Sequence, residues 1–275
     1  MILLGGNSRQ SLASLRDTLD EKLNGLSAAD CTAMSEDLFT VVIALNSSVG
    51  LRRAFTDPSR DAQSKAVLVQ NLFGDALSKN VLFIILEAVS LRWSSPVDVA
   101  SAVEQLAIEA EATAANAEGS LDRVQDELFI FGRTLAEHQE LRQILGDRLG
   151  STAGKSEIIS SLLGNKAAPS TVRLLTQLVN GLAGRSIDSV QEIYIDAVAA
   201  RRNRLNVLVR TRSALSAAQI DKLTRIMTEQ VGQPVHLNFD IDPSVIGGVS
   251  IRFADEIVDG TISTRLADAG RALAV

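Results

Sequence analysis

A glycine-rich stretch that ends in lysine and serine is the part of the sequence most suggestive of chemistry. It runs Gly150-Ser151-Thr152-Ala153-Gly154-Lys155-Ser156. A phosphate-binding loop places four residues between its glycines and follows a β-strand, so that backbone N–H groups surround the phosphates. Here three residues separate the glycines, and residues 140–149 before them have a helical pattern. A nucleotide-binding enzyme that uses Lys155 is one hypothesis, and a helix that begins near Lys155 is the one we favour.

The other residue types that carry catalysis are few and scattered. One cysteine and two histidines are too few for a disulfide framework or a cysteine-rich zinc site. Acidic pairs are more frequent, but they stand beside alanine and glutamine on predicted helix surfaces, without an apolar pocket to shift a pKa. We therefore predict a protein that is not an enzyme and that binds no cofactor or metal. The residues weighed are Cys31, His138 (expected on a solvated helix face), His236, and the pairs Glu109/Glu111 and Asp126/Glu127.

Composition favours a helical protein and argues against several classes. The 275 residues carry 27 Lys and Arg against 33 Asp and Glu, a net charge of -6, whereas nucleic-acid binding needs a basic surface. With Gly 18 and Pro 5 turns are scarce, and 46% apolar residues suffice for a core. No stretch approaches the ~20 apolar residues that span a bilayer. The start does not have the pattern of a signal peptide, and a single cysteine suits a reducing compartment.

Apolar spacing predicts helices over most of the first 200 residues. In residues 8–23 leucine recurs along one helical face, which indicates an amphipathic helix. Residues 35–119 and 122–200 are also helical in pattern, and turn-forming residues separate the helices. The predicted breaks fall at 57–58, 74, 94–96, 146–154, 164–169 and 181–184.

These breaks recur at a fixed distance along the chain. A shift of 90 residues aligns 37–110 with 127–200 without a gap, and 13 positions are identical where about 5 are expected by chance. Lys65 aligns with Lys155 and has no glycine near it, which is a second reason to place Lys155 at a helix start. We interpret the two stretches as copies of one helical unit. The identical pairs include Leu38/Leu128, Leu45/Leu135, Arg52/Arg142, Asp57/Asp147, Gly74/Gly164 and Val89/Val179.

After residue 200 the pattern changes to short strands mixed with helices. Alternation along residues 235–241 places Val235, Leu237, Phe239 and Ile241 on one face, which we expect to be the core face. A Ser-x-x-Gln capping box predicts the start of a helix just before this strand. The expected elements are strands at 206–211, 235–241 and 249–253, a helix from Ser216 with the apolar stripe Ile220, Leu223, Ile226 and Met227, a turn at Asp255 and Asp259-Gly260, and a last helix with Leu266, Ala269 and Leu273.

The predicted fold class is mainly α, namely a helical bundle with a duplicated helical unit followed by a small α+β C-terminal domain. The predicted domains are residues 1–118 (first helical unit), 119–204 (second helical unit) and 205–275 (C-terminal domain). Charge divides along nearly the same line, because residues 201–275 carry a net +2 and the helical part carries -8. Such an asymmetry is more typical of solvated faces than of a binding site.

Two motifs in the C-terminal domain resemble those of a known family. Residues 241–249 read Ile-Asp-Pro-Ser-Val-Ile-Gly-Gly-Val, and residues 257–266 read Ile-Val-Asp-Gly-Thr-Ile-Ser-Thr-Arg-Leu. Their order and spacing resemble the C-terminal signature of the F-type ATP synthase delta subunit, whose mitochondrial counterpart is the oligomycin-sensitivity-conferring protein, with Thr261 where serine is usual. The resemblance extends over about residues 127–275, and residues 8–23 look like the family's first helix. The extra helical unit is similar to extended bacterial forms.

The resemblance implies a mechanical function. Delta subunits join the N-terminal helices of the alpha subunits in the catalytic head to the b-type subunits of the peripheral stalk, and so resist rotor torque during proton-driven ATP synthesis. It implies a non-catalytic subunit, present once in a hetero-oligomeric complex at the cytoplasmic face of the bacterial plasma membrane, with no nucleic-acid partner and no membrane span of its own. A generic helical scaffold of another complex is the alternative.

Apolar residues at two places could contact these partners. The leucines of the first helix and apolar residues of 82–89 are expected to form a groove for an amphipathic alpha-subunit helix, although the same residues would equally serve as bundle core. The patch at 245–248 is expected to contact the b subunit, or to form a tight turn. The candidates are Leu12, Leu15, Leu19, Leu82, Ile85, Leu86 and Val89 for the first surface and Val245, Ile246, Gly247 and Gly248 for the second.

Overall fold

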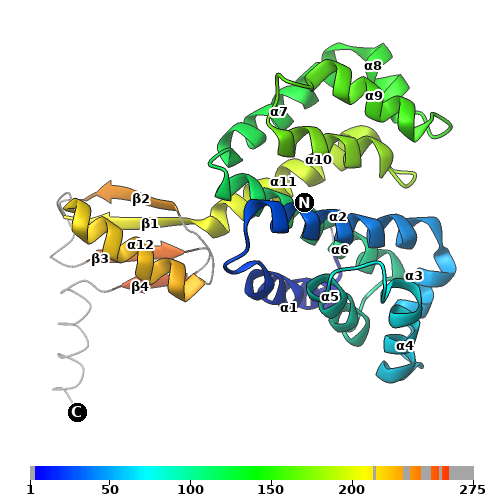
Figure 1. Ribbon diagram of the computed structural model, residues 1–275, viewed down its shortest axis with the longest axis horizontal. Helices are drawn as coiled ribbons and strands as arrows, with labels where there is room; N and C mark the ends of the chain where they lie inside the picture. The colour runs from blue at the N-terminus through cyan, green and yellow to red at the C-terminus, as the bar shows by residue number, and fades with distance from the viewer. Residues whose placement is uncertain (1–3, 213–214, 232–235, 243–248, 254–255, 260–275) are drawn as a thin grey trace. The chain divides into compact units, whose positions relative to one another are not determined.

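The computed structural model describes residues 4–212, 215–231, 236–242, 249–253 and 256–259, and the chain divides into two compact units, Met1–Ala199 and Ala200–Val275 (Figure 1). The predicted mainly α fold is confirmed. Within the described ranges, no single helix is long and apolar enough to cross a membrane. The helices α2 (Ala28–Ser47) and α3 (Val49–Thr56) are long and apolar enough only when taken together, and they are bent by 108° relative to each other. The division of the helical part at 118/119 stays a prediction.

The first unit is built from helices that begin and end close to the predicted breaks. Serine and aspartate side chains accept hydrogen bonds from backbone N–H groups at several of their starts, as N-caps do. Besides α2 and α3, the helices are α1 (Gly6–Leu23), α4 (Ala62–Phe73), α5 (Lys79–Ser90), α6 (Pro96–Ala117), α7 (Leu121–Glu137), α8 (Gln139–Gly146), α9 (Thr152–Leu163), α10 (Pro169–Asn180) and α11 (Ile187–Leu205), the last of which continues into the second unit.

The helix bounds recur with the offset of 90 residues that the sequence predicts. α3, α4 and α5 begin and end 90 residues before α8, α9 and α10, and α1 begins 90 residues before α6. α6 in turn precedes α11 by nearly the same distance. One helix, α6, is therefore both the last member of a first set (α1–α6) and the first member of a second set (α6–α11).

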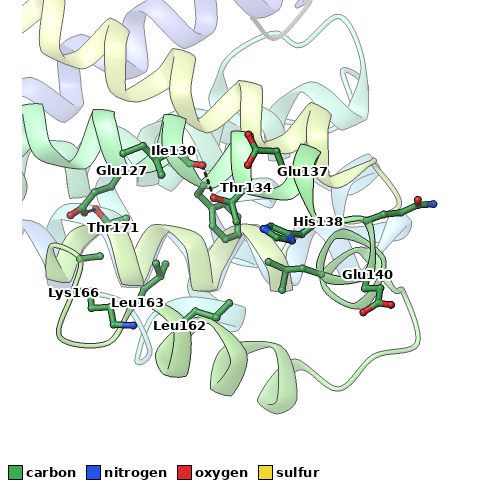
Figure 2. A pocket seen from close by; sticks show the side chains of 14 residues that line it. Glu127, Ile130, Thr134, Glu137, His138, Glu140, Leu162, Leu163, Lys166 and Thr171 are labelled. Atoms are coloured by element: carbon green, nitrogen blue, oxygen red, sulfur yellow. Dashed lines mark hydrogen bonds between the residues drawn. The ribbon is translucent and has the colours of Figure 1, made fainter.

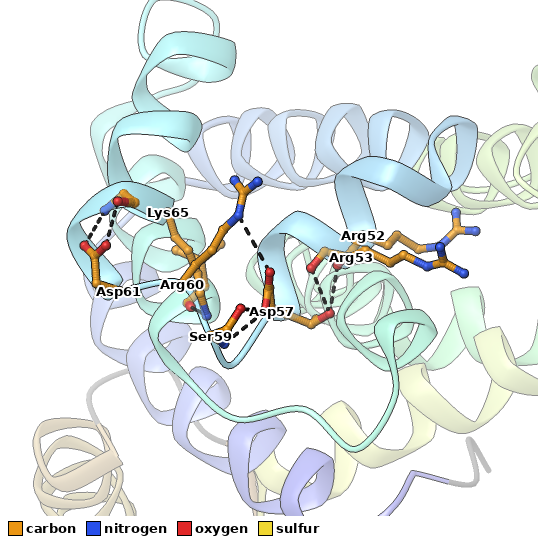
Figure 3. Close-up of polar contacts among 10 residues, drawn as sticks. Arg52, Arg53, Asp57, Ser59, Arg60, Asp61 and Lys65 are labelled. Atoms are coloured by element: carbon orange, nitrogen blue, oxygen red, sulfur yellow. Dashed lines mark hydrogen bonds and ion pairs between the residues drawn. The ribbon is translucent and has the colours of Figure 1, made fainter.

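The breaks between helices are also built alike in the two sets. Asp57 and Asp147 each accept a hydrogen bond of 2.9 Å from the backbone N–H two residues later (the first is drawn in Figure 3). Gly74 and Gly164 follow α4 and α9, and each donates its N–H to the carbonyl four residues earlier at 2.8 Å. A Cβ atom would lie 2.6 Å from that carbonyl oxygen at Gly74 and 2.7 Å from it at Gly164, so both turns need glycine.

α6 is the central helix of the first unit. It packs against α1, α2, α3, α7 and α10, and every residue from Leu106 to Ala115 is buried, as are most of those from Val99 to Gln105. Its many alanines allow these neighbours to approach closely, and a helix buried all round is expected to be apolar all round. Three glutamates depart from that expectation and are described below. Large side chains that complete the core include Leu15, Leu19, Leu38, Leu45, Phe55, Ile84, Ile85 and Leu106.

The second unit contains a four-stranded sheet in the order β2-β1-β3-β4. α12 (Ala217–Val231) connects β1 (Asn206–Thr211) to β2 (His236–Ile241), and these two strands are parallel, which requires such a crossover. β3 (Val249–Phe253) is antiparallel to both β1 and β4 (Glu256–Asp259). The described core of this unit consists of Val209, Met227 and Ile251, with Leu223 and Leu237 packed against them.

The second unit differs from the sequence predictions in two respects. Residues 256–259 form β4, where we expected only turns, because they pair with β3. Ile241, which was expected on the core face, is 56% exposed because it is the last residue of β2, a strand at the edge of the sheet. Ile226, which was expected in the apolar stripe of the helix, is 39% exposed. The expected last helix, with Leu266, Ala269 and Leu273, and the residue Val235 fall outside the described residues.

Candidate functional site

The residues predicted to bind an amphipathic helix lie on α1 and α5, two helices that pack against each other. Leu15 and Leu19 of α1 are fully buried, and so are Ile85 and Val89 of α5. Leu12 is buried as well. These five side chains therefore contribute to the core of the first set in this structure.

The remaining two predicted residues are more accessible. Leu82 and Leu86 are half-buried on α5, and Phe83 between them is 51% exposed, with Lys22 Nζ lying 4.4 Å from its ring centroid. We call Lys22, Leu82, Phe83 and Leu86 the α1–α5 face. Sequence reasoning missed Phe83 because it stands outside the leucine stripe, although an aromatic residue exposed on a helix is a common contact residue. The second predicted patch, Val245, Ile246, Gly247 and Gly248, lies outside the described residues.

Glu87 fixes the two helices of this face relative to each other. Its carboxylate accepts hydrogen bonds from Ser14 Oγ at 3.0 Å and from Thr18 Oγ1 at 2.6 Å, both on α1. A carboxylate that accepts two side-chain donors from one neighbouring helix restricts sliding between the helices. The α1–α5 face is therefore formed before any partner binds.

Lys155 points to a carbonyl and not into a phosphate-binding loop. Its side chain is buried, and Nζ donates a hydrogen bond to the carbonyl of Val179 near the end of α10 at 3.3 Å. Lys65 donates in the same way to the carbonyl of Val89 near the end of α5, at 3.1 Å. A Cβ at Gly150 would lie 3.2 Å from Lys155 Cε, so this glycine leaves room for the lysine. The helix-start interpretation accounts for the motif, since a lysine there satisfies the last carbonyls of a neighbouring helix.

Removal of the ammonium group of either lysine should therefore destabilise the fold to the same extent. We expect Lys155→Met and Lys65→Met each to lower the free energy of unfolding by about 1–2 kcal/mol, because a buried carbonyl loses a charged donor while the aliphatic stem is kept. Urea denaturation followed by circular dichroism measures this. ATP titrated against the wild-type chain and both variants is the control. Saturable binding that is lost only in Lys155→Met would support the nucleotide hypothesis instead.

Three buried glutamates of α6 each pair with an arginine of another segment. Glu109 pairs with Arg16 of α1, whose Nη2 lies 2.7 Å from Oε1. Glu111 pairs with Arg173 of α10 at 2.6 Å between Nη2 and Oε1. The prediction that Glu109 and Glu111 lie on a helix surface is wrong, because α6 is covered on all sides and the arginines compensate the buried charges.

The third pair has the most complete geometry. Arg185, after α10, donates from Nη1 and Nη2 to the two oxygens of Glu104 at 2.7 and 2.9 Å, a bidentate arrangement. It also donates to the carbonyls of Gly181 and Leu182. Burial by itself would lower the pKa of Arg185, but the hydrogen bonds and charge of Glu104 outweigh it and raise that pKa. Because Arg173 and Arg185 both belong to the later part of the second set, these two pairs join the rest of that set to α6.

Glu127 joins α7 to α10. Its Oε2 accepts hydrogen bonds from the N–H of Ala168 at 2.9 Å and from Thr171 Oγ1, and its Oε1 accepts one from Arg123 Nε at 2.7 Å. Burial would raise the pKa of Glu127, but these bonds, led by that of Thr171, lower it below the usual 4.5. The ionised form is therefore favoured by the folded structure.

The lowered pKa predicts a pH-dependent contribution to stability. A depressed folded-state pKa stabilises the fold above the unfolded-state value, and the contribution is lost as the pH falls through the folded-state pKa. We expect Glu127→Gln to lower the free energy of unfolding by about 1 kcal/mol at pH 7, with the difference from wild type shrinking as the pH falls from the usual carboxyl value of 4.5 through the lower folded-state pKa. Urea denaturation across this range measures it. Asp126→Asn, next to it and exposed, is the control, and an equal effect there would contradict the assignment.

The other groups singled out from the sequence do not come together. Cys31 is buried in α2, and His138 is exposed between α7 and α8, where its backbone is not helical. The prediction of a helix-face position for His138 is therefore wrong, because one helix ends and the next begins at this residue. Among the residues that the structure describes, no group of three or more His, Cys, Asp and Glu side chains could hold a metal ion. His236 lies on β2.

The sequence of this chain is similar to those of known proteins from one family. The sequence model of the family described as ATP synthase delta (OSCP) subunit matches residues 108–273. A relative from Streptomyces coelicolor, named ATP synthase subunit delta, is 40% identical over 269 residues, which covers 98% of both chains. One from Kineococcus radiotolerans with the same name is 37% identical over 269 residues, covering 98% of this chain and 97% of the relative.

A solved chain from the Toxoplasma gondii mitochondrial ATP synthase hexamer is 17% identical, with a TM-score of 0.30, covering 61% of this chain and 97% of that one. That likeness is too weak to support a statement about the fold. The sequence relatives, in contrast, match nearly the whole length of this chain, which contains both helical sets. On the strength of that match, the chain belongs to the ATP synthase delta (OSCP) subunit family.

Proposed function

We propose that this chain is the non-catalytic connector of a proton-translocating ATP synthase, joining the N-terminal helices of the alpha subunits in the catalytic head to the b-type subunits of the peripheral stalk. The observation that carries the proposal is the α1–α5 face. Leu82, Phe83 and Leu86 present an apolar strip beside Lys22, on two helices that Glu87 holds together. An amphipathic helix can lay its apolar side on such a strip.

The two helical sets together are suited to a subunit that must resist torque. α6 belongs to both sets, and the ion pairs of Glu104, Glu109 and Glu111 join it to neighbouring segments. We infer that residues 1–118 bind the alpha subunits, that residues 119–204 extend the connector, and that residues 205–275 bind the b subunit through the patch at 245–248. In this proposal one copy is present per complex, held at the cytoplasmic face of the bacterial plasma membrane through its partners.

Affinity purification of the tagged full-length chain from its own cells tests the assembly. We expect alpha and b-type subunits to elute with it, in proportions that match one copy of this chain per complex. A scaffold of another complex would elute with different proteins and with neither subunit. That outcome would show the proposal to be wrong, provided that the tagged chain has the helical content of the untagged one.

A direct titration tests the docking step. A synthetic peptide with the sequence of the alpha subunit's N-terminal helix should bind the full chain saturably, and calorimetry should give a defined stoichiometry. Competition by an excess of unlabelled peptide is the control for non-specific adhesion of an amphipathic helix. Absence of saturable binding would contradict the docking part of the proposal while leaving family membership unaffected.

A further inference from the structure

The second set contains an open groove that is separate from the α1–α5 face. Segments of α7, α8, α9 and α10 enclose a volume of about 890 Å³, and Figure 2 shows α7 along one side and α9 along the other. Apolar side chains of α7, α8 and α9 line it, among them Ile130, Phe131, Leu141, Leu162 and Leu163, and α10 contributes Thr171.

The first set shows why this space is open. The positions that correspond to Leu163, Ala167 and Thr171 after the shift of 90 residues are Phe73, Leu77 and Val81. In the first set these three larger residues are buried between the helices. In the second set each is replaced by a smaller or more polar residue, and Leu163 and Ala167 are only half-buried. At these three positions the same helical framework therefore holds bulkier apolar side chains in the first set than in the second.

The walls of the groove are held in place without a ligand. Glu127 accepts hydrogen bonds from Ala168 and Thr171, and Arg123 donates from Nη2 to the carbonyl of Lys166 at 2.7 Å. These contacts connect α7 to the segment between α9 and α10. A pre-formed groove loses little conformational entropy when it binds a partner, which favours affinity.

Exposed apolar side chains border the groove. Ile130 of α7 is 59% exposed and Leu162 of α9 is 45% exposed, and Figure 2 shows them on facing sides of the opening. Exposed apolar residues on both sides of a groove mark a surface that gains free energy when it is covered. From Glu127 to His138 the groove follows α7 for about 16 Å, the length of about three helical turns.

The charges at one end indicate the chemistry of the partner. Glu137 and Glu140 are exposed where α7 meets α8, beside His138, and Lys166 lies at the other end of the groove (Figure 2). Glu137 pairs with Arg133 at 3.5 Å, a contact between two exposed side chains that contributes little. This end therefore carries a net negative charge that a partner with lysine or arginine would complement.

From the groove and its charges, we propose that the second set binds an amphipathic helix of about three turns, with large apolar side chains along one side and Lys or Arg at the end that lies over Glu137 and Glu140. The helix belongs to a partner protein, and the surface is additional to the α1–α5 face. The proposal goes beyond the connector function and does not depend on which subunit binds α1 and α5.

A designed peptide tests the binding mode. The probe is a labelled 12-residue helix with leucines at every third or fourth position and lysines at one end, titrated against the full chain by fluorescence anisotropy. Its matched twin carries glutamates in place of the lysines. We expect the lysine peptide to bind about tenfold more tightly than the glutamate peptide at low salt, with the preference decreasing as salt rises. No saturable binding of the lysine peptide, or equal affinities for both peptides, would overturn the proposal.

The first set supplies the variant that closes the groove. Leu163→Phe with Ala167→Leu introduces the residues that fill the same space at Phe73 and Leu77. We expect this double variant to weaken binding at least tenfold while circular dichroism and the thermal midpoint show an intact fold. Unchanged affinity in a folded double variant would place the peptide elsewhere and overturn the proposal.

A matched pair of rim variants gives the control. Leu162→Ala in the second set and Leu72→Ala in the first remove the same exposed leucine at aligned positions, 45% and 49% exposed. We expect about a fivefold loss of affinity for Leu162→Ala and none for Leu72→Ala. Equal losses at Leu162 and Leu72 would contradict the proposal.

The charge assignment has its own test. Glu137→Gln with Glu140→Gln should reduce the preference for the lysine peptide to about one, because both carboxylates at that end are neutralised. Analytical ultracentrifugation of the wild-type chain tests whether a second copy of the chain occupies the groove. A dimer that disappears in the Leu163→Phe/Ala167→Leu variant would mean that the groove binds its own chain, and it would overturn the assignment to a partner protein.

Discussion

Arg185→Ala is expected to lower the free energy of unfolding by about 3–5 kcal/mol, a larger effect than any surface substitution in this chain should have. The reason is the position of Glu104. Its side chain is 2% exposed, and both of its oxygens accept hydrogen bonds from the Arg185 guanidinium. Without the arginine, the carboxylate stays buried without its compensating charge. Urea denaturation of the full chain at pH 7, followed by circular dichroism, measures the loss.

Two further variants separate the buried charge from the packing of the arginine. Arg133→Ala breaks an ion pair with Glu137 whose side chains are 70% and 63% exposed, and it should cost at most about 0.5 kcal/mol. Glu104→Met with Arg185→Met removes both charges and should recover most of the loss, since a buried pair can be replaced by apolar groups at little cost. A double variant as unstable as Arg185→Ala would show that packing, and not the uncompensated carboxylate, dominates.

The helical part of the fold could be predicted because its signals are local. The leucine spacing that marks a helix, and the residues that end one, such as Gly74 and Gly164, can be recognised from a few consecutive residues. The duplication repeats the same pattern 90 residues later. A repeat also provides an internal test of a motif. Lys155 looks like part of a phosphate-binding loop alone, but Lys65 in the aligned position makes the same hydrogen bond to a carbonyl.

The ion pairs of α6 could not be predicted from the same signals. Whether Glu109 and Glu111 are exposed depends on how many helices surround α6, and that is decided by tertiary packing. One sequence feature does indicate burial, because alanines occur on every face of the helix formed by residues 99–115. In a helix of that kind a glutamate needs a partner, and Arg16, Arg173 and Arg185 provide three.

The candidate site was predicted only in part, for a related reason. The periodicity that identifies an apolar face does not distinguish a core face from a docking face. Leu15 and Leu19 belong to the core, whereas Leu82 and Leu86 are half-buried, and Phe83 lies outside the predicted stripe. In the second unit, Ile241 alternates as a core residue does but lies at the end of an edge strand. Neighbours distant in sequence decide such cases.

Phe83→Asp is expected to weaken binding of the alpha subunit's N-terminal helix by at least about 30-fold, or about 2 kcal/mol. The aspartate would place a charge in the middle of the α1–α5 face, where an apolar side chain of the partner would have to desolvate it. Phe83 is 51% exposed, so the free energy of unfolding should change by no more than about 0.5 kcal/mol. Calorimetric titration of the peptide against the full chain measures the affinity.

Phe129→Asp is the matched control, because Phe129 is a second exposed phenylalanine, 59% exposed, and lies on α7 in the other set. We expect it to leave the affinity unchanged. Leu15→Ala gives the opposite contrast, since removal of a fully buried side chain should cost about 2–5 kcal/mol of stability. If Phe129→Asp weakens binding and Phe83→Asp does not, the alpha-subunit helix binds the second set, and the α1–α5 face is not its docking site.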